Sequence, residues 1–247
     1  MKQELRIEQL NEYVEEHIDA FHTKRLEKLQ KLNLKKILKR KKPYLFKAKH
    51  ILKSQDLIES LLDAFLQSQE ETLFGNFLEE VAIFVCGNIF GGIKTQNLEG
   101  IDLLFFKNEI LYIVEIKSGP NWGNSSQLKK LKDNFRKAKA ILSKKYPNTT
   151  IIAVNGCCYG KERKTDKGEY FKYCGQEFWE FISDNPNLYT DIIDPLGYKA
   201  KEKNEAFDKA YVRVINKFTF EFMKDFCNNS GDINWKGLVA FNSEKSI

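Results

Sequence analysis

Residues 100–119, GIDLLFFKNEILYIVEIKSG, decide the fold of this chain. Two runs rich in Leu, Ile, Val, Phe and Tyr flank a polar tripeptide at 107–109, a pattern typical of two antiparallel strands joined by a short loop. If the loop is centred between the last two residues of that tripeptide, Asp102 on the first strand lies opposite Glu115 on the second, so their side chains share a face. Lys117 follows Glu115 by two residues, and the strand period of two places it on that face as well.

Two carboxylates and one amine therefore converge near one end of the predicted hairpin. Charges among apolar neighbours are costly unless they are paired or bound to a metal. Two carboxylates at metal-ligand spacing offer oxygen ligands, which Mg²⁺ prefers. The amine of Lys117 could orient an attacking water and offset charge on a phosphorane-like transition state. The alternative is that Asp102 caps a strand edge while Glu115 and Lys117 form a surface ion pair.

The stretches Gly-Ile-Asp102 and Val-Glu115-Ile-Lys117 resemble the active-site signature of the PD-(D/E)XK nuclease superfamily, and the arrangement resembles a type II restriction endonuclease. Ile101 replaces the Pro that gives the motif its name. The resemblance covers about residues 72–156. It implies hydrolysis of double-stranded DNA at a specific short sequence, with Asp102 and Glu115 as Mg²⁺ ligands and Lys117 beside the attacking water. It also implies products with a 5′-phosphate and a 3′-hydroxyl, and a homodimer that matches a symmetric DNA site.

The elements around the hairpin predict an α/β fold with a restriction-endonuclease-like core, in which a mixed β-sheet is flanked by α-helices. A buried strand is predicted at 150–155, and a helix with Ser125 or Ser126 as its N-cap precedes it. Helices are predicted over the segments 3–41 (as one helix or two), 55–69, 72–88, 127–145, 176–183 and 205–227. We expect residues 1–70 to form a helical N-terminal region and residues 71–247 the nuclease core with a C-terminal helical extension, together one compact unit.

A glutamate on the helix before the Asp102 strand is a further candidate for the catalytic group. Glu79 and Glu80 lie on opposite borders of the apolar stripe of the helix at 72–88. Family members resemble this arrangement, with a helix Glu that binds metal or supports a ligand. The spacing from Gly75 favours Glu79, and the alternative is that both glutamates face solvent.

Two segments are candidates for contact with DNA. The first follows the predicted strand at 150–155 and interleaves aromatic residues with the cations Lys161, Arg163, Lys164 and Lys167. The second is the polar turn after Lys117, with Ser118, Asn124 and Gln127. The first segment is suited to reading base edges in a groove, and the second to touching the scissile phosphate. The alternatives are a hydrophilic hairpin in solvent and ordinary turn chemistry.

A basic run near the end of the first predicted helical segment has two interpretations. Its cations are Lys35, Lys36, Lys39, Arg40, Lys41 and Lys42. They either form an arm that contacts phosphates or a solvated helix end with cations favourably placed near its C-terminus.

Composition indicates a globular chain with a basic excess. The 247 residues, 42% of them hydrophobic, suffice for a real core, and 40 Lys and Arg against 34 Asp and Glu favour a polyanionic partner. Five cysteines without zinc-ligand spacing, a charged start without a signal-peptide pattern and no apolar run near twenty residues predict a reduced, cytoplasmic protein with no membrane partner. The rival functions are a repair or structure-specific DNA nuclease and a non-catalytic nucleic-acid-binding protein.

Overall fold

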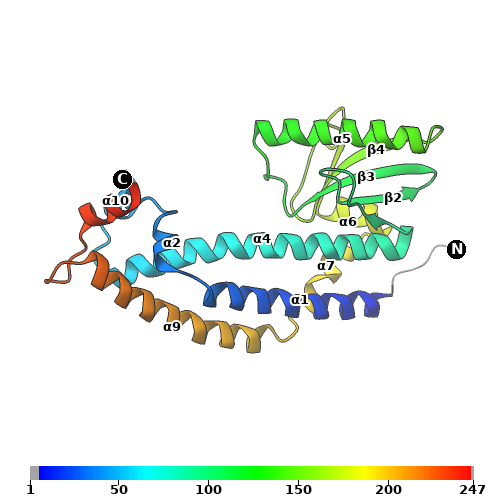
Figure 1. Ribbon diagram of the computed structural model, residues 1–247. Coiled ribbons are helices and arrows are strands. Elements are labelled where there is room, and N and C mark those ends of the chain that lie inside the picture. Colours follow the sequence, from blue (N-terminus) through cyan, green and yellow to red (C-terminus); the bar gives the residue numbers. More distant parts are fainter. Residues whose placement is uncertain (1–5, 246–247) are drawn as a thin grey trace. The chain divides into compact units, whose positions relative to one another are not determined.

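The computed structural model of the chain describes residues 6–245, which fold into two compact units (Figure 1). The first unit contains residues 74–198 and the start of helix α1 up to Asp19. The second contains residues 20–73 and the chain from Lys199 onward. Helices α1 (Ile7–Gln30) and α4 (Ser54–Phe90) contribute residues to both units. The expected start of the first helix, at residues 3–5, lies outside the described residues, and the division of the chain near residue 70 stays a prediction.

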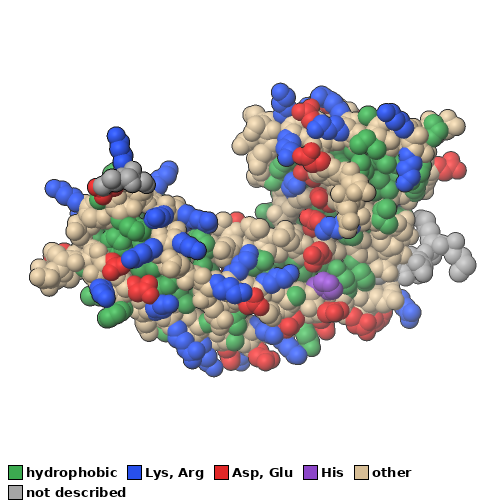
Figure 2. Space-filling view, in the orientation of Figure 1, with side chains coloured by type: hydrophobic (Ala, Val, Ile, Leu, Met, Phe, Trp, Pro, Cys, Tyr) green, Lys and Arg blue, Asp and Glu red, His purple; other side chains and the backbone are tan. Residues whose placement is uncertain are grey.

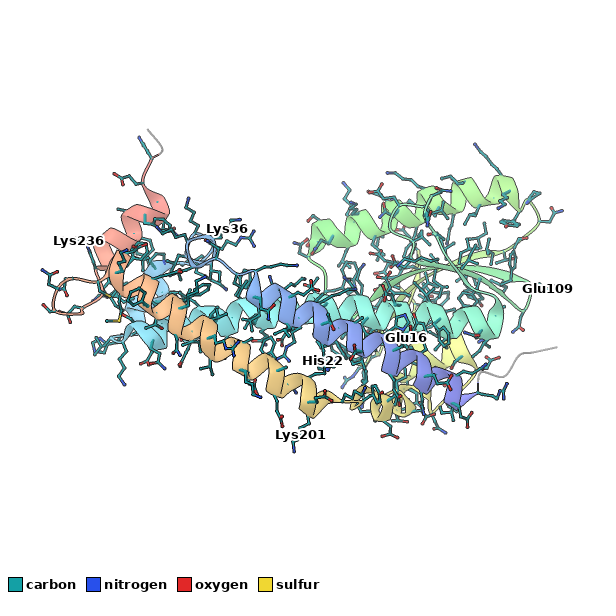
Figure 3. The ribbon with its side chains drawn as sticks, turned by 60° about the horizontal axis from the view of Figure 1, so that its bottom comes forward. Glu16, His22, Lys36, Glu109, Lys201 and Lys236 are labelled. Atoms are coloured by element: carbon teal, nitrogen blue, oxygen red, sulfur yellow. The ribbon has the colours of Figure 1, made fainter. Side chains whose placement is uncertain are left out.

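The first unit is built on a five-stranded mixed sheet whose strands follow each other in sequence order. The strands are β1 (Ile93–Lys94), β2 (Leu103–Lys107), β3 (Ile110–Lys117), β4 (Ile151–Cys157) and β5 (Phe171–Cys174). The β1–β2 and β2–β3 pairs are antiparallel, and the β3–β4 and β4–β5 pairs are parallel. Lys107 pairs with Ile110, so the hairpin has the two-residue loop that the sequence predicts. Both loop residues, Asn108 and Glu109, have positive φ, as tight hairpin turns require, and Glu109 lies at the outer tip (Figure 3).

Helices cover both faces of this sheet (Figure 1). Helix α5 (Ser125–Lys145) packs Leu131 and Phe135 against Ile113 and neighbouring residues on one face. On the other face the Phe105 ring stacks on Phe90 of α4 and lies against Phe181 of α6 (Gln176–Ser183). The short helices α7 (Leu188–Asp191) and α8 (Ile193–Leu196) follow. The predicted α/β class with a mixed, helix-flanked sheet is confirmed.

The second unit is entirely helical in its described part. Besides its portions of α1 and α4 it contains α2 (Leu34–Leu38), α3 (Pro43–Ala48), α9 (Ala200–Phe226) and α10 (Trp235–Ser243). Its core joins buried residues of α2 and α4 to the aromatic stripe of α9, with members including Ile37, Leu61, Phe218 and Phe222. The predicted stripe of α9 is thus a core face, and the helix begins at Ala200 rather than at Glu205.

Two sequence-based boundaries are wrong. The predicted helices at 55–69 and 72–88 are one continuous α4, because Thr72 does not cap a new helix: its hydroxyl donates to the Ser68 carbonyl oxygen at 3.0 Å, a bond made within a helix. Helix α5 is capped by Asn124 rather than by Ser125 or Ser126. The Asn124 side chain accepts from the Gln127 N–H at 3.1 Å, and the Gln127 side chain accepts from the Asn124 N–H at 2.9 Å, which completes a capping box.

Helix α4 also passes a length and composition test for a membrane span, which the sequence reading did not anticipate. Core helices of soluble proteins pass the same test, and Val81, Ala82 and Val85 of α4 are fully buried in this protein. All five cysteines lie in the described part of the chain, and none of them forms a disulfide there.

Gly156 provides a test of the packing between the sheet and α6. A Cβ atom added at Gly156, in the middle of the sheet, would lie 2.2 Å from the Phe178 ring. We expect Gly156→Ala to lower the free energy of unfolding by about 1–3 kcal/mol, because a packed core resists added methyl groups. Urea denaturation measures this change.

Gly75→Ala is the matched control for that variant. Its Cβ would lie 3.6 Å from Ser118, an ordinary contact, and Ala is the better helix former by about 1 kcal/mol. Equal destabilisation by the two substitutions would contradict the packing described here.

Candidate active site

Asp102 lies directly before β2 and faces the second carboxylate through the hairpin register. Leu103 pairs with Val114, so the next pair outward is Asp102 with Glu115, and the Asp102 N–H donates to the Val114 carbonyl oxygen at 2.9 Å. The Ile116 N–H donates to Asp102 Oδ2 at 2.7 Å, which fixes the carboxylate against β3. The structure therefore brings the two predicted acids to adjacent strands at one end of the hairpin.

Lys117 completes this group. Its Nζ lies 2.6 Å from Glu115 Oε1, and the side chains are 29% and 11% exposed respectively. The second carboxylate oxygen, Glu115 Oε2, is buried and has no hydrogen-bond partner in the described chain. A buried carboxylate oxygen with no partner is costly, and a divalent cation beside Asp102 would satisfy it. The residues present thus fit a cation with oxygen ligands.

The electrostatics of Asp102 reflect its position among these charges. Burial raises the pKa of Asp102 to about 6, while the hydrogen bond from the Ile116 N–H acts in the opposite direction. The charges of Glu79 and Glu115 raise this pKa further, and the charge of Lys117 lowers it. A carboxyl surrounded by two other acids favours the proton unless positive charge is close by.

Glu79 is the helix glutamate that lies nearer to this group. Its Oε1 accepts from Lys94 Nζ at 3.0 Å, and its charge acts on Asp102. Glu80 is not among the charges that shift the pKa of Asp102, but it raises the pKa of Tyr13 on α1. The structure thus gives different surroundings to the two glutamates that the sequence left as alternatives.

Trp122 and Asn155 also belong to this neighbourhood, and the sequence analysis missed both roles. Lys117 Nζ lies 5.2 Å from the centroid of the Trp122 ring, a cation–π contact. The Trp122 Nε1–H donates to Asn155 Oδ1 at 3.1 Å, and Asn155 Nδ2 donates to the Glu115 carbonyl oxygen at 3.2 Å. Asn155 is 1% exposed and pairs with Glu115 in the parallel register of β3 and β4. The two residues hold the turn after β3 against the ammonium of Lys117.

The predicted phosphate-contacting residues of that turn have structural partners. Asn124 and Gln127 cap each other at the start of α5, as described above. Ser118 lies at the end of β3, and its carbonyl oxygen accepts from the Tyr159 N–H at 3.0 Å. Helix capping by Asn124 and Gln127 agrees with the turn-chemistry alternative, and a contact of these three residues with DNA stays a prediction.

The predicted base-reading cations lie in the loop between β4 and β5. Lys161, Arg163 and Lys164 are exposed, whereas Lys167 Nζ lies 3.1 Å from Glu162 Oε2. A cavity of about 890 Å³ separates part of this loop from the start of α5. Its lining includes Lys129, Lys132, Lys164 and Lys167. The loop and the helix thus present cations to one hollow, without a residue that identifies what fills it.

Within residues 6–245, no three His, Cys, Asp or Glu side chains gather closely enough to form a complete metal cage. The candidate site is therefore an acid pair with a neighbouring lysine, not a saturated metal centre. Such a pair leaves coordination positions for water and phosphate oxygens, as catalytic Mg²⁺ sites do.

A mixed sheet with helices on both faces, and an Asp, a Glu and a Lys at the ends of adjacent strands, defines a restriction-endonuclease-like PD-(D/E)XK nuclease. The family model described as type II restriction endonuclease EcoO109I matches residues 8–204. The chain belongs to this family of type II restriction endonucleases. No curated protein matches the chain.

The bond between Trp122 and Asn155 can be tested by a double-mutant cycle. Trp122→Phe and Asn155→Ala each remove one partner of a buried hydrogen bond, so we expect each to lower the free energy of unfolding by about 1–3 kcal/mol. Because the two side chains interact, their effects should differ from additivity by at least about 0.5 kcal/mol. Chemical denaturation of the four proteins measures this coupling. Strictly additive effects would show that the bond contributes nothing.

Proposed function

We propose that this chain is a Mg²⁺-dependent type II restriction endonuclease that cleaves double-stranded DNA at a specific short sequence. It acts in the cytoplasm as a homodimer, because a two-fold symmetric DNA site is matched by a two-fold symmetric protein. The observation that carries the proposal is the approach of Lys117 Nζ to within 2.6 Å of Glu115, on the strand that pairs with Asp102, in a chain of this family.

Each residue of the group has a separate role in the proposed reaction. Asp102 and Glu115 hold the Mg²⁺, and the unpartnered Glu115 Oε2 supplies one of its ligands. Bound Mg²⁺ supplies Lewis-acid activation of the phosphate and lowers the pKa of a coordinated water. Lys117 orients the attacking water and offsets negative charge on the phosphate, and its contacts with Glu115 and Trp122 hold its ammonium in place. Glu79 supports the site from α4.

The loop cations Lys161, Arg163, Lys164 and Lys167 are proposed to contact DNA, with Arg163 suited to a guanine edge. Ser118, Asn124 and Gln127 are proposed to lie near the scissile phosphate. In Asn124 and Gln127 the side chains already serve the helix cap, so a phosphate contact would use their remaining donors.

Incubation of the protein with unmethylated phage DNA and Mg²⁺, followed by mapping of the ends, tests the proposal directly. We expect discrete fragments with 5′-phosphate and 3′-hydroxyl ends, and no cleavage in EDTA. Cleavage confined to branched or damaged DNA would favour a structure-specific nuclease. Binding without any cleavage would favour a non-catalytic DNA-binding protein.

Substitution of the proposed catalytic group should abolish cleavage without loss of fold. We expect Asp102→Ala to remove detectable cleavage and Lys117→Ala to reduce its rate by about 100-fold to 10,000-fold, the usual contribution of a group that assists proton transfer. Glu99→Ala and Lys130→Ala are matched controls, because these residues form an exposed ion pair at 3.1 Å on the same unit. Rates equal to wild type for Asp102→Ala would refute the assignment.

The two helix glutamates can be separated by neutral substitutions of the same shape. We expect Glu79→Gln to reduce the cleavage rate by about 10-fold to 100-fold, as for other residues that support a metal ligand, and Glu80→Gln to leave it unchanged. Single-turnover cleavage measures both rates. The reverse order of effects would assign the supporting role to Glu80.

A further inference from the structure

The segment 28–53 of the second unit is far more basic than the rest of the chain. It contains eleven Lys and Arg and no Asp or Glu, whereas the net charge of all 247 residues is +6. Figure 2 shows Lys and Arg side chains gathered over α2 and its surroundings. Like charges at this density repel each other, so a folded surface that carries them without carboxylates is suited to a polyanion.

Most of these cations have no carboxylate partner. Lys31 pairs with Glu27 at 3.1 Å and Lys35 with Asp225 at 3.0 Å. Within residues 6–245, no ion pair joins Lys28, Arg40 or Lys41 to an acid. The charges that remain are therefore available to a ligand rather than committed to the fold.

Three of these free cations line one cavity. The cavity has a volume of about 400 Å³, and its lining contains Lys28, Arg40 and Lys41 together with polar side chains of α4. The polar residues are Ser68, Gln69 and Thr72. Three cations with hydroxyl and amide groups, and no acid, form the donor set that binds phosphate oxygens. The volume is large enough for a phosphate group with part of its sugar.

The turn that carries these cations is held in a fixed conformation. Asn242 of α10 donates from Nδ2 to the carbonyl oxygens of Leu38 at 2.9 Å and of Lys41 at 3.2 Å. Leu38 itself is buried in the core of the unit. The backbone between these two residues, which carries Lys39 and Arg40, is thus clamped at both ends. Cations on a rigid turn lose little backbone entropy when they bind a ligand.

We propose that the segment 28–53 is a second DNA-binding surface, on which the cavity lined by Lys28, Arg40 and Lys41 receives a backbone phosphate of duplex DNA. The inference rests on the proposed function, since that function makes duplex DNA the polyanion that the protein meets. The surface adds affinity without reading sequence, because contacts with phosphates carry no base information.

The experiment measures the salt dependence of DNA binding by the full-length protein. A labelled duplex of arbitrary sequence is titrated in EDTA, so that no cleavage occurs, between about 50 and 200 mM salt. Substitution of Lys28, Arg40 and Lys41 by Ala should reduce the magnitude of the slope of log K against log salt by about 2 to 3 and weaken binding at low salt by at least about 10-fold. The single variant Arg40→Gln, at an exposed side chain, should reduce the slope by about 0.9 and serves if the triple variant does not fold.

The matched control removes two Lys and one Arg from α9 of the same unit. Lys201, Lys209 and Arg213 are exposed, and Lys201 lies on the opposite side of the unit from Lys36 (Figure 3). Their joint substitution by Ala removes the same charge and should leave the slope near the wild-type value. Equal slopes for the two triple variants would reduce the effect to net charge and overturn the proposal. Tighter binding to phosphatidylserine vesicles than to duplex DNA would overturn it as well.

Failure of this inference is distinguishable from failure of the proposed function. If the wild-type protein cleaves DNA with Mg²⁺ but the cavity variant keeps the wild-type slope, the second surface is refuted and the nuclease assignment stands. If the slope falls as expected but no DNA is cleaved under any condition, the surface stands and the nuclease assignment is refuted.

Discussion

Two carboxylates that lie close together in a largely apolar sheet are the constraint on which the first unit depends. Asp102 and Glu115 repel each other, and burial raises the cost of their charges. The Ile116 N–H and the Lys117 ammonium offset part of this cost, and one Glu115 oxygen remains without a partner. An arrangement that costs stability and is held in place by neighbouring strands is typical of a functional site rather than of a scaffold.

The surroundings of this group explain why a rigid sheet serves it. Strand β3 carries both Glu115 and Lys117, and β4 lies beside it in a parallel register. Asn155 on β4 binds Trp122 in the turn, and Trp122 contacts the Lys117 ammonium. Three segments distant in sequence thus determine the position of one amine. Loops alone, with their greater mobility, would hold it less firmly.

The sequence predicted what short-range periodicity determines. The hairpin register follows from a two-residue loop and from strand alternation, so the approach of Asp102 to Glu115 was predictable. The continuous α4 was not, because Thr72 reads as a cap until its hydroxyl is seen to bond to Ser68 within the helix. Trp122 and Asn155 are 33 residues apart, and no local pattern signals that their side chains meet. The cavity on the helical unit likewise joins α1, the turn after α2 and α4, although the basic run itself was evident.

The parallel pairing of β3 and β4 has a consequence for how the protein reaches its working form. A β-hairpin closes quickly because its contacts are local, whereas a parallel pair must wait for the whole crossover helix between its strands. A chain emerging from the ribosome can thus form β2 and β3, and bring its acids together, before Asn155 has been synthesised. During that interval Trp122 has no acceptor and Lys117 no ordered neighbour in the turn. An ordered active site is therefore acquired late, when β4 joins the sheet.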